Sequence, residues 1–321
     1  MIRFGIVGAG GIAQKFASDI KFSEGAIATA VASRNLERAN EFKDEFDIEY
    51  AFGSYEEMAK SDLIDAVYIA TPHSFHMEQS ILFMNHKKHV LCEKPIAVNV
   101  SQFEKMVTCA KENNVLLMEA MWTRFLPVTK MVRELVQSKK LGKLKHAYLE
   151  FGFEVMGLGG DSGRLFNANL AGGSLLDMGV YPVAYTLNIT NQSIKSIEAT
   201  AKKYKTGIDT ECVVDVTFED DSTARLVSSF LADKNNPGVI EFENGKIVIE
   251  NFWRSQKVFI DKKEFEFPFI GEGFPYQING FVGSLEKGLL ENEIMTHDQT
   301  RKSMMMLDSI RKVIKLKYPF E

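Results

Sequence analysis

The first thirteen residues place the strongest constraint on how this chain can fold. Residues 2–7 form a short apolar run that favours a buried strand, and Gly8-Ala-Gly10-Gly11-Ile12-Ala13 follows at once, leading into a helical pattern. In the spacing G-x-G-x-x-A, Gly8 permits a tight turn, Gly10 lets a ligand approach the backbone, and Ala13 lets the helix pack against the strand. The helix N-terminus then offers N–H groups and a partial positive charge to phosphates. This segment predicts a dinucleotide-binding site.

Strand-like and helix-like segments alternate up to about residue 120. We expect further strands at 27–32, 49–52, 65–70, 89–92 and 115–119, with helices near 36–45, 55–60, 74–86 and 99–113. Such alternation is typical of a doubly wound parallel sheet in an α/β fold. In these sheets ligands bind outside the carboxyl ends of the strands, so the residues that follow each strand are candidates for a site.

From residue 121 the pattern changes to that of a second domain. We expect a helix reaching about residue 138, a strand at about 143–155, a glycine-rich loop at 156–163 and a helix at 172–185. Strands of period two then fill 194–267, with turns at Asp220-Asp221 and Asn244-Gly245, before two helices at about 275–291 and 298–316. We therefore predict residues 1–120 as a nucleotide-binding domain. We expect residues 121–321 to form an α/β domain built on a largely antiparallel open sheet. The last helix of this domain is able to pack back on the first domain.

Composition excludes several classes of protein. The net charge of −5 argues against a nucleic-acid binder, which needs a basic face, and no apolar run reaches the length of a membrane span. The first residues lack the layout of a signal peptide. Cys92, Cys109 and Cys212 are an odd, widely spaced set without a C-x-x-C pair. These features predict a cytoplasmic protein with free thiols and without a zinc site, nucleic-acid partner or membrane partner.

The end of the second strand bears on the choice of cofactor. A site that prefers NAD usually carries an acidic residue there, which accepts hydrogen bonds from the ribose 2′-hydroxyl. This chain has Ser33 and Arg34 instead, with Arg38 one helical turn further on. Arg34 can bind a 2′-phosphate through two nitrogens, whereas an acid would repel it. We therefore predict a preference for NADP, with NAD possible; the alternative is that these are ordinary surface arginines at a helix start.

Two other strand ends carry polar residues. Lys94 follows the strand 89–92 between Glu93 and Pro95. A lysine there cannot face the core without compensation, and the proline holds it in an extended backbone where ligands bind. The alternative is a solvated Glu93–Lys94 charge pair. Thr71-Pro72-His73 closes the strand 65–70, so Thr71 and Pro72 are expected to touch the cofactor. His73 and His76 are either bases or, more often for such residues, capping and packing groups.

The predicted helix at 172–185 is poorly built for stability alone. Asp177 and Tyr181 are four residues apart and therefore share one helical face. Gly179 lies between them, and Pro182 removes a backbone hydrogen bond from the same helix. An acid and a phenol together on such a helix favour a chemical role, although a solvated aspartate with an interfacial tyrosine remains the alternative.

Taken together, these residues resemble the glucose–fructose oxidoreductase / inositol dehydrogenase (Gfo/Idh/MocA) family. The matching motifs occur in the family order over the first 181 residues: Gly8 to Ala13, Ala70-Thr-Pro72, Glu93-Lys-Pro95, Gly172-Gly173 and Asp177-x-x-x-Tyr181. Met121-Trp-Thr-Arg-Phe125, and tyrosine rather than histidine at 181, are similar to the branch of trans-dihydrodiol and NADP-dependent xylose dehydrogenases. The resemblance implies a Rossmann domain, a cis Lys94–Pro95 bond and a homodimer or homotetramer formed through the open sheet.

The resemblance also implies an NADP-dependent dehydrogenase that acts on the CH–OH group of a sugar, polyol or cyclic diol. The implied catalytic residues are Lys94, Asp177 and Tyr181. We expect Trp122 and Phe153 to form apolar walls of the substrate site beside them. The implied cofactor contacts are Gly8, Gly10, Gly11, Ile12, Ala13, Ser33, Arg34, Arg38, Thr71, Pro72, Glu93, Lys94, Trp122 and Arg124. No metal is required.

The chemistry expected of these residues is hydride transfer coupled to the movement of a proton. A free phenol or ammonium has a pKa near ~10, so the site must adjust one of them for work at neutral pH. We expect Tyr181 to exchange the proton, Lys94 to bind the substrate oxygen and Asp177 to orient them, although the roles of Lys94 and Tyr181 are exchangeable. Two other functions stay open: a sugar-processing enzyme that retains its cofactor, and a non-enzymatic nucleotide sensor.

Overall fold

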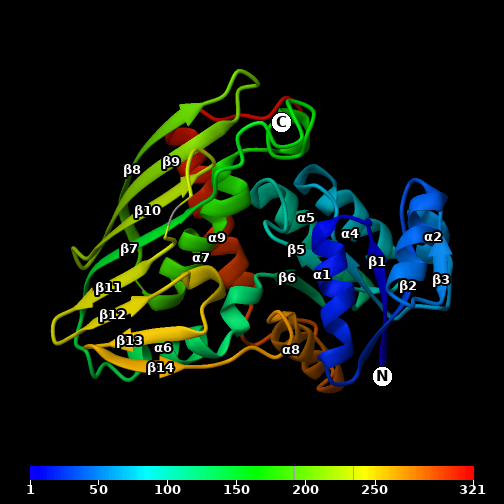
Figure 1. Cartoon of the computed structure of the whole chain (residues 1–321), viewed down its shortest axis with the longest axis horizontal. Coiled ribbons are helices and arrows are strands. Elements are labelled where there is room, and N and C mark those ends of the chain that lie inside the picture. Colours follow the sequence, from blue (N-terminus) through cyan, green and yellow to red (C-terminus); the bar gives the residue numbers. More distant parts are fainter. Residues whose placement is uncertain (191, 234) are drawn as a thin grey trace. The chain divides into compact units, whose positions relative to one another are not determined.

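Figure 1 shows the computed structural model, which describes residues 1–190, 192–233 and 235–321. The chain divides into two compact units, one made of Met1–Phe125 with Phe269–Thr300 and the other of Leu126–Pro268 with Arg301–Glu321. The sequence predicted a boundary near residue 120 and allowed the last helix to pack back on the first domain, whereas this division also assigns Phe269–Thr300 to the first unit. The reason is that α8 (Phe274–Glu286) packs on the first sheet, where Phe281 contacts Phe4 at a ring distance of 5.5 Å. Nothing in the spacing of apolar residues reveals which sheet a late helix will cover.

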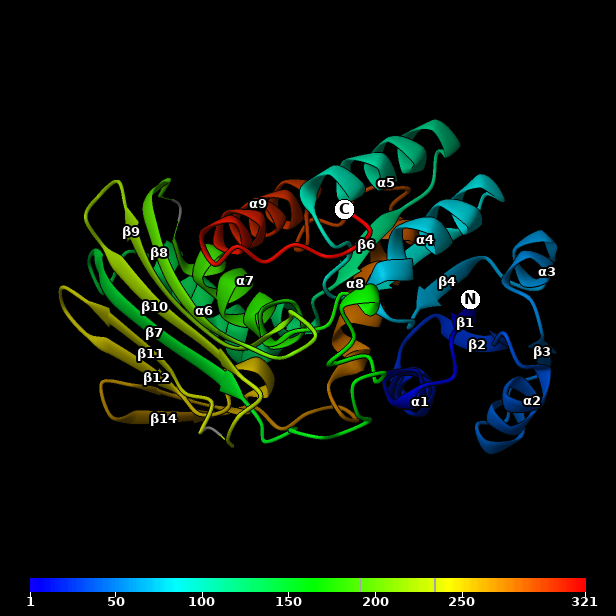
Figure 2. The ribbon, with the colours of Figure 1, turned by 90° about the horizontal axis from the view of Figure 1, so that it is seen from above.

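The first unit is built on a parallel sheet of six strands in the order β3-β2-β1-β4-β5-β6, as the alternation of segments predicted. The strands are β1 (Ile2–Val7), β2 (Ala26–Ala32), β3 (Tyr50–Phe52), β4 (Ala66–Ile69), β5 (His89–Glu93) and β6 (Leu117–Ala120). The other helices are α1 (Gly11–Asp19), α2 (Leu36–Glu45), α3 (Tyr55–Lys60), α4 (His76–Asn85) and α5 (Val100–Asn113). Figure 2 shows α4 and α5 over one face of this sheet and α1 and α8 over the other.

Short polar side chains determine where several of these helices begin. Asn35 accepts a hydrogen bond from the backbone N–H of Arg38, and Ser54 and Asn99 cap α3 and α5 in the same way. Such caps satisfy N–H groups that have no partner inside the helix. At the other end of α5, Asn114 adopts a left-handed conformation with φ of 55° and stops the helix.

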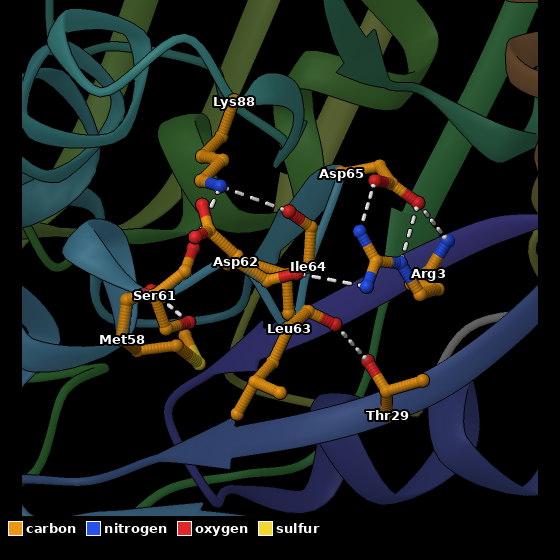
Figure 3. Close-up of polar contacts among 9 residues, drawn as sticks. All are labelled: Arg3, Thr29, Met58, Ser61, Asp62, Leu63, Ile64, Asp65 and Lys88. Atoms are coloured by element: carbon orange, nitrogen blue, oxygen red, sulfur yellow. Dashed lines mark hydrogen bonds and ion pairs between the residues drawn. The ribbon is translucent and has the colours of Figure 1, made fainter.

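The amino ends of the central strands are joined by polar contacts (Figure 3). The Arg3 guanidinium binds the Asp65 carboxylate at 2.6 Å and the Asp62 carbonyl oxygen at 2.8 Å. The Lys88 ammonium donates to the carbonyl oxygens of Ser61 and Ile64 at 2.8 and 3.0 Å. These contacts tie β1, β4 and β5 together at the edge opposite to their carboxyl ends.

The second unit contains an eight-stranded sheet in the order β14-β13-β12-β11-β7-β10-β9-β8, and only the pairing of β7 with β10 is parallel among the described residues. The strands are β7 (Leu144–Gly152), β8 (Ile194–Lys203), β9 (Asp209–Phe218), β10 (Thr223–Ser229), β11 (Gly238–Phe242), β12 (Lys246–Ile249), β13 (Lys257–Ile260) and β14 (Lys263–Glu266). Figure 2 shows α6 (Pro127–Gln137), α7 (Val180–Ile189) and α9 (His297–Val313) along one face of the sheet. No helix of the described residues has the length and apolar character that a membrane crossing requires.

The helix predicted at 172–185 begins later and has two parts. Leu175–Gly179 forms a π-helical turn, and α7 continues from Val180. Pro182 therefore lies in the first turn of α7 rather than inside a long α-helix. Because proline has no N–H to offer to the preceding turn, the regular α-helical ladder is interrupted here. Asp177 lies within the π-helical turn, and Tyr181 is the second residue of α7.

Candidate active site

The glycine-rich turn after β1 has the shape that a bound phosphate requires. Gly8 has φ of +97°, and a Cβ added there would lie 3.2 Å from the Ala70 carbonyl oxygen. A Cβ added at Gly10 or Gly11 would meet no described heavy atom within 4 Å, so the backbone there is open to a ligand. Gly10 caps α1 without a side-chain hydrogen bond, and Ala13 is fully buried beneath it. These residues fit a dinucleotide pyrophosphate at the helix N-terminus.

Two arginines lie beside this turn. Arg38 donates a hydrogen bond from Nη2 to the Ala9 carbonyl oxygen at 2.8 Å, and the Arg34 guanidinium lies 5.7 Å from the centre of the Phe75 ring. Burial raises the pKa of Tyr55. The positive charges of Arg34 and Arg38 both oppose this rise, because each favours the ionised phenol. The end of β2 thus combines a cationic pair with the phosphate-binding turn. This combination suits an additional phosphate on the ribose.

The ends of β4 and β5 are connected by a buried histidine. One ring nitrogen of His76 lies 2.8 Å from the Pro95 carbonyl oxygen, and the other lies 2.8 Å from that of Thr71. The Thr71 hydroxyl donates to the Gln79 side chain at 2.5 Å. His76 therefore holds together the two loops in which Thr71 and Lys94 lie, and both loops are positioned at the carboxyl edge of the sheet.

Glu93 is buried, with an exposed fraction of only 6%. Its carboxylate accepts hydrogen bonds from the Tyr68 hydroxyl and, at 3.2 Å, from the backbone N–H of Lys94. The Lys94–Pro95 peptide bond is cis, as the resemblance implied, and the Lys94 side chain is half-buried. The buried carboxylate thus holds the backbone of Lys94 at the strand end.

The last strand of the sheet leads to Trp122 and Arg124, which are both buried. The indole of Trp122 stacks on Phe274 of α8, with ring centres 5.1 Å apart, and meets Phe269 edge-on. Glu119 accepts hydrogen bonds from the N–H of Ile96 and the Thr300 hydroxyl, and burial raises its pKa to about 7. Trp122 and Arg124 are therefore held by the core of the first unit, and their contact with the cofactor remains a prediction.

In the second unit, Asp177 is paired with an arginine that the sequence analysis did not identify. Asp177 Oδ1 lies 2.9 Å from Nη1 of Arg164, and the exposed fractions of the two side chains are 12% and 53%. Arg164 directly follows the glycine-rich loop and belongs to no motif, so only the fold shows that it approaches the helix. The pair places a largely buried carboxylate beside a guanidinium that reaches solvent.

Aromatic rings surround Tyr181, which is 6% exposed. Phe151 meets its ring edge-on at 5.1 Å, and Trp253 does so at 6.1 Å. Phe153, the predicted substrate wall, packs edge-on against Trp253 at 5.9 Å. Trp253 was also missed, because it lies in a strand-rich region without a motif. A phenol, an ion pair and apolar ring surfaces are therefore brought together inside the second unit.

The predicted site residues form two groups, each within one unit. Those at the carboxyl edge of the parallel sheet, Lys94 included, belong to the first unit, and Asp177, Tyr181 and Phe153 belong to the second.

Comparison with known proteins agrees with this architecture. The model of an oxidoreductase family with an NAD-binding Rossmann fold, Gfo/Idh/MocA, matches residues 2–121, and the model of the C-terminal domain of the same family matches residues 129–248. The chain is 35% identical to the Bacillus subtilis scyllo-inositol 2-dehydrogenase (NADP(+)) IolU, over 99% of both chains. It is 33% identical to the mouse trans-1,2-dihydrobenzene-1,2-diol dehydrogenase, over 99% of this chain and 98% of the relative.

Among solved structures, the 3-ketoreductase KijD10 of Actinomadura kijaniata, in complex with NADP and TDP-benzene, superposes with a TM-score of 0.86. It is 23% identical over 98% of both chains, which is a likeness of fold. The family models and the two full-length relatives are independent of that likeness and lead to one conclusion. The chain belongs to the Gfo/Idh/MocA family of NAD(P)-dependent oxidoreductases.

Proposed function

We propose that this protein is an NADP-dependent dehydrogenase that acts on the CH–OH group of a sugar, polyol or cyclic diol. The observation that carries the proposal is the cationic pair Arg34 and Arg38 beside the glycine-rich turn, where Arg38 binds the Ala9 carbonyl oxygen. Ser33 occupies the position at which an acid would select the ribose hydroxyls of NAD. The full-length similarity to IolU, which is named for NADP, supports the same preference.

The proposed roles follow from the surroundings of each side chain. When bound, the nicotinamide supplies the acceptor or donor of the hydride. Lys94, held on a backbone tied to Glu93, binds and polarises the substrate oxygen. Tyr181 exchanges the proton of that oxygen, and Asp177, oriented by Arg164, positions the substrate. The roles of Lys94 and Tyr181 are exchangeable, because the ammonium and the phenol are acids of similar strength when free.

The aromatic surroundings of Tyr181 support the proposed class of substrate. Phe153 and Trp253 provide flat apolar surfaces, while the Arg164–Asp177 pair provides polar groups for hydroxyls. A ring that has one apolar face and several hydroxyl groups matches such a surface. Trp122, stacked on Phe274 in the first unit, is a second proposed wall.

The proposal is tested first by assaying the purified protein with aldoses, polyols and dihydrodiols, each with NADP and with NAD. Absorbance of the reduced nicotinamide reports turnover. Lys94→Ala should lower kcat/KM by about a hundredfold or more, since it removes the group that stabilises the reacting oxygen. The Kd for NADP should change by less than about threefold. Turnover of Lys94→Ala close to that of the wild type would reject the assignment.

Lys88→Ala is the matched control, because it removes a lysine at the amino end of the same region. Lys88 donates to the carbonyl oxygens of Ser61 and Ile64, far along β5 from Lys94. We expect this variant to lose some thermal stability and to keep its kcat. We further propose a cytoplasmic location, since Cys92, Cys109 and Cys212 are free, buried thiols.

A further inference from the structure

The helix that carries Asp177 and Tyr181 starts from a loop, Gly172–Ser174, that is held by a buried acid from another strand. Oδ2 of Asp209, at the start of β9, accepts hydrogen bonds from the Ser174 hydroxyl and the Leu175 N–H, both at 2.7 Å. Asp209 is fully buried. It therefore caps the π-helical turn in the way that an N-terminal cap residue normally does, but from a distant part of the chain.

The loop has little freedom to take another path. Gly173 has φ of +119°, and a Cβ added there would lie 2.3 Å from Asp209 Oδ1. A Cβ added at Gly172 would lie 2.5 Å from the Leu165 carbonyl oxygen, to which the Gly173 N–H donates at 2.9 Å. The chain therefore passes through a close fit five residues before Asp177.

The segment 316–321 holds the same loop from a second direction. The hydroxyl of Tyr318 donates to the Gly172 carbonyl oxygen at 2.8 Å, and Tyr318 is 1% exposed. The Arg311 guanidinium lies 4.7 Å from the centre of the Tyr318 ring. The Glu321 carboxylate binds Arg311 and accepts the Tyr318 N–H at 3.0 Å. The tyrosine is thus fixed at its ring and at its backbone.

The charges around Tyr318 keep its hydroxyl a donor. Burial, and then the nearby Asp209 carboxyl, raise the pKa of Tyr318 well above its ordinary value. Burial likewise raises the pKa of Asp209, and the charge of Arg311 opposes this rise. The phenol therefore stays protonated throughout the range in which an enzyme of this family would be assayed.

We propose that Tyr318 is a positioning residue for the reaction: its hydroxyl holds the Gly172 carbonyl and so determines where the π-helical turn begins and where Asp177 and Tyr181 lie. The inference rests on the roles proposed above for those two residues. A π-helical turn is uncommon and needs contacts from outside the helix to keep its register. Asp209 supplies such a contact at the first residue of the turn, and Tyr318 supplies one at Gly172, three residues before it. A small shift of this loop is carried to the reacting groups.

The test is Tyr318→Phe, which removes only the hydroxyl and leaves the ring beside Arg311. We expect kcat to fall about tenfold, because reacting groups that are slightly misplaced lose much of their effect. KM and the Kd for NADP should each change by less than about threefold. Tyr148→Phe is the matched control. Tyr148 lies in β7 of the same unit and alternates with the buried Ala147 and Leu149, so its side chain is on the half-buried face of the strand, and the kcat of this variant should not change.

A merely structural role predicts a different result. Tyr318→Phe would then lower Tm while kcat per folded active site and KM stayed at the wild-type values, and that outcome would overturn the inference. The double variant with Tyr181→Phe provides a second readout. If Tyr318 acts through Tyr181, adding Tyr318→Phe to Tyr181→Phe should cost less than about a further twofold in kcat. If the fold-losses in kcat of Tyr318→Phe and Tyr181→Phe simply multiply in the double variant, the inference is wrong.

Variants at Asp177, Tyr181 and Tyr318 together distinguish a failure of this inference from a failure of the proposed function. If Tyr181→Phe and Asp177→Asn both keep wild-type activity, the proposed function of the helix is wrong. If they are inactive and Tyr318→Phe is fully active, only the role of Tyr318 is wrong. Should Tyr318→Phe fail to fold, Glu321→Gln decides the question, because it weakens the contact with Arg311 and leaves the phenol in place. We expect it to lower kcat about two- to threefold, and an unchanged kcat would overturn the inference.

Discussion

At the scale of the residue, charged side chains define what each part of the site can bind. Arg34 and Arg38 both follow β2, and the positive charges of both oppose the rise that burial gives to the pKa of Tyr55. At an effective dielectric of ~20 and a separation of ~4 Å, one charge pair contributes up to ~4 kcal/mol before screening. By contrast, Arg164 neutralises Asp177 at 2.9 Å, so that carboxylate is already oriented before substrate arrives.

Reversing one of these charges should change the cofactor preference. In Arg34→Asp, a carboxylate repels the 2′-phosphate of NADP and can accept hydrogen bonds from the ribose hydroxyls of NAD. We expect the ratio of kcat/KM for NADP to that for NAD to fall by about 10- to 100-fold. The measurement is initial rates with both cofactors at one ionic strength.

Lys43→Asp makes the same change of charge in the last turn of α2, away from the glycine-rich turn. In this variant the ratio of kcat/KM for NADP to kcat/KM for NAD should stay within about twofold of the wild-type ratio. An unchanged ratio in Arg34→Asp would show that Arg34 does not contact the phosphate.

At the scale of the element, the two edges of the parallel sheet have different tasks. The amino edge is joined by Arg3, Asp65 and Lys88, whose contacts bind neighbouring strands to one another (Figure 3). The carboxyl edge instead carries the glycine-rich turn, Thr71 and Lys94, which are the residues proposed to bind the cofactor and the substrate oxygen. Parallel strands make this division possible because all their carboxyl ends lie at one edge.

The ion pair at the amino edge should contribute stability that depends on pH. The hydrogen bond from Arg3 and the positive charge of Arg3 lower the pKa of the Asp65 carboxyl group below its value of about 3.9 in the unfolded chain. Stability from this pair is therefore present above about pH 4 and is lost as pH falls through the lowered pKa. We expect Asp65→Asn to lower Tm by about 1–3 °C at pH 7 and by less near pH 3, with kcat unchanged.

Thr29→Val is the control for this experiment. It removes the neutral hydrogen bond from the Thr29 hydroxyl to the Leu63 carbonyl oxygen, 2.9 Å long, at the same edge. Its effect on Tm should not vary with pH in this range. If Asp65→Asn lowers Tm by as much at pH 3 as at pH 7, the Arg3–Asp65 contact makes no ionic contribution to stability and this prediction is wrong.

At the scale of the whole molecule, the eight-stranded sheet of the second unit has one face without a helix of the described residues (Figure 2). Paired residues form one row across it: Glu198, Asp215, Arg225, Tyr148, Val239, Val248, Phe259 and Glu264. Its middle from Tyr148 to Phe259 is apolar and only half-buried, beside a hollow of about 550 Å³ lined in part by Val248 and Phe259. We propose that this face joins two copies of the chain.

This proposal predicts that a charge in the apolar part of the row separates the copies. In Phe259→Asp, association of two copies would bury a carboxylate without a partner. Burying such a charge costs on the order of several kcal/mol, which is enough to weaken the dimer strongly. We expect light scattering after gel filtration to give a multiple of the chain mass for the wild type and a single chain mass for the variant.

Phe22→Asp introduces the same change at a phenyl ring that is 50% exposed in the first unit, and it should leave the mass unchanged. A wild-type protein that is monomeric at micromolar concentration would remove the basis for this interface.

Local patterns were sufficient for much of the fold. The bounds of α2 and α5 follow from asparagine caps, and the glycine-rich turn follows from spacing alone, because these features depend on neighbours within a few residues. The division of the chain did not follow, since α8 joins the first unit through Phe281 and Phe4, which lie far apart in the sequence. Arg164 and Trp253 were missed for the same reason.

The sequence by itself determined the chemistry that is available: which strand ends carry a lysine, an arginine or a phenol, and in what order. Only the tertiary structure decided which of those groups are neutralised, buried or held by distant residues. Asp177 with Arg164, and Gly172 with Tyr318, are contacts across 13 and 146 residues. Propensity and periodicity act over a few residues, whereas such pairs form only when packing brings remote segments together, and no local signal encodes them.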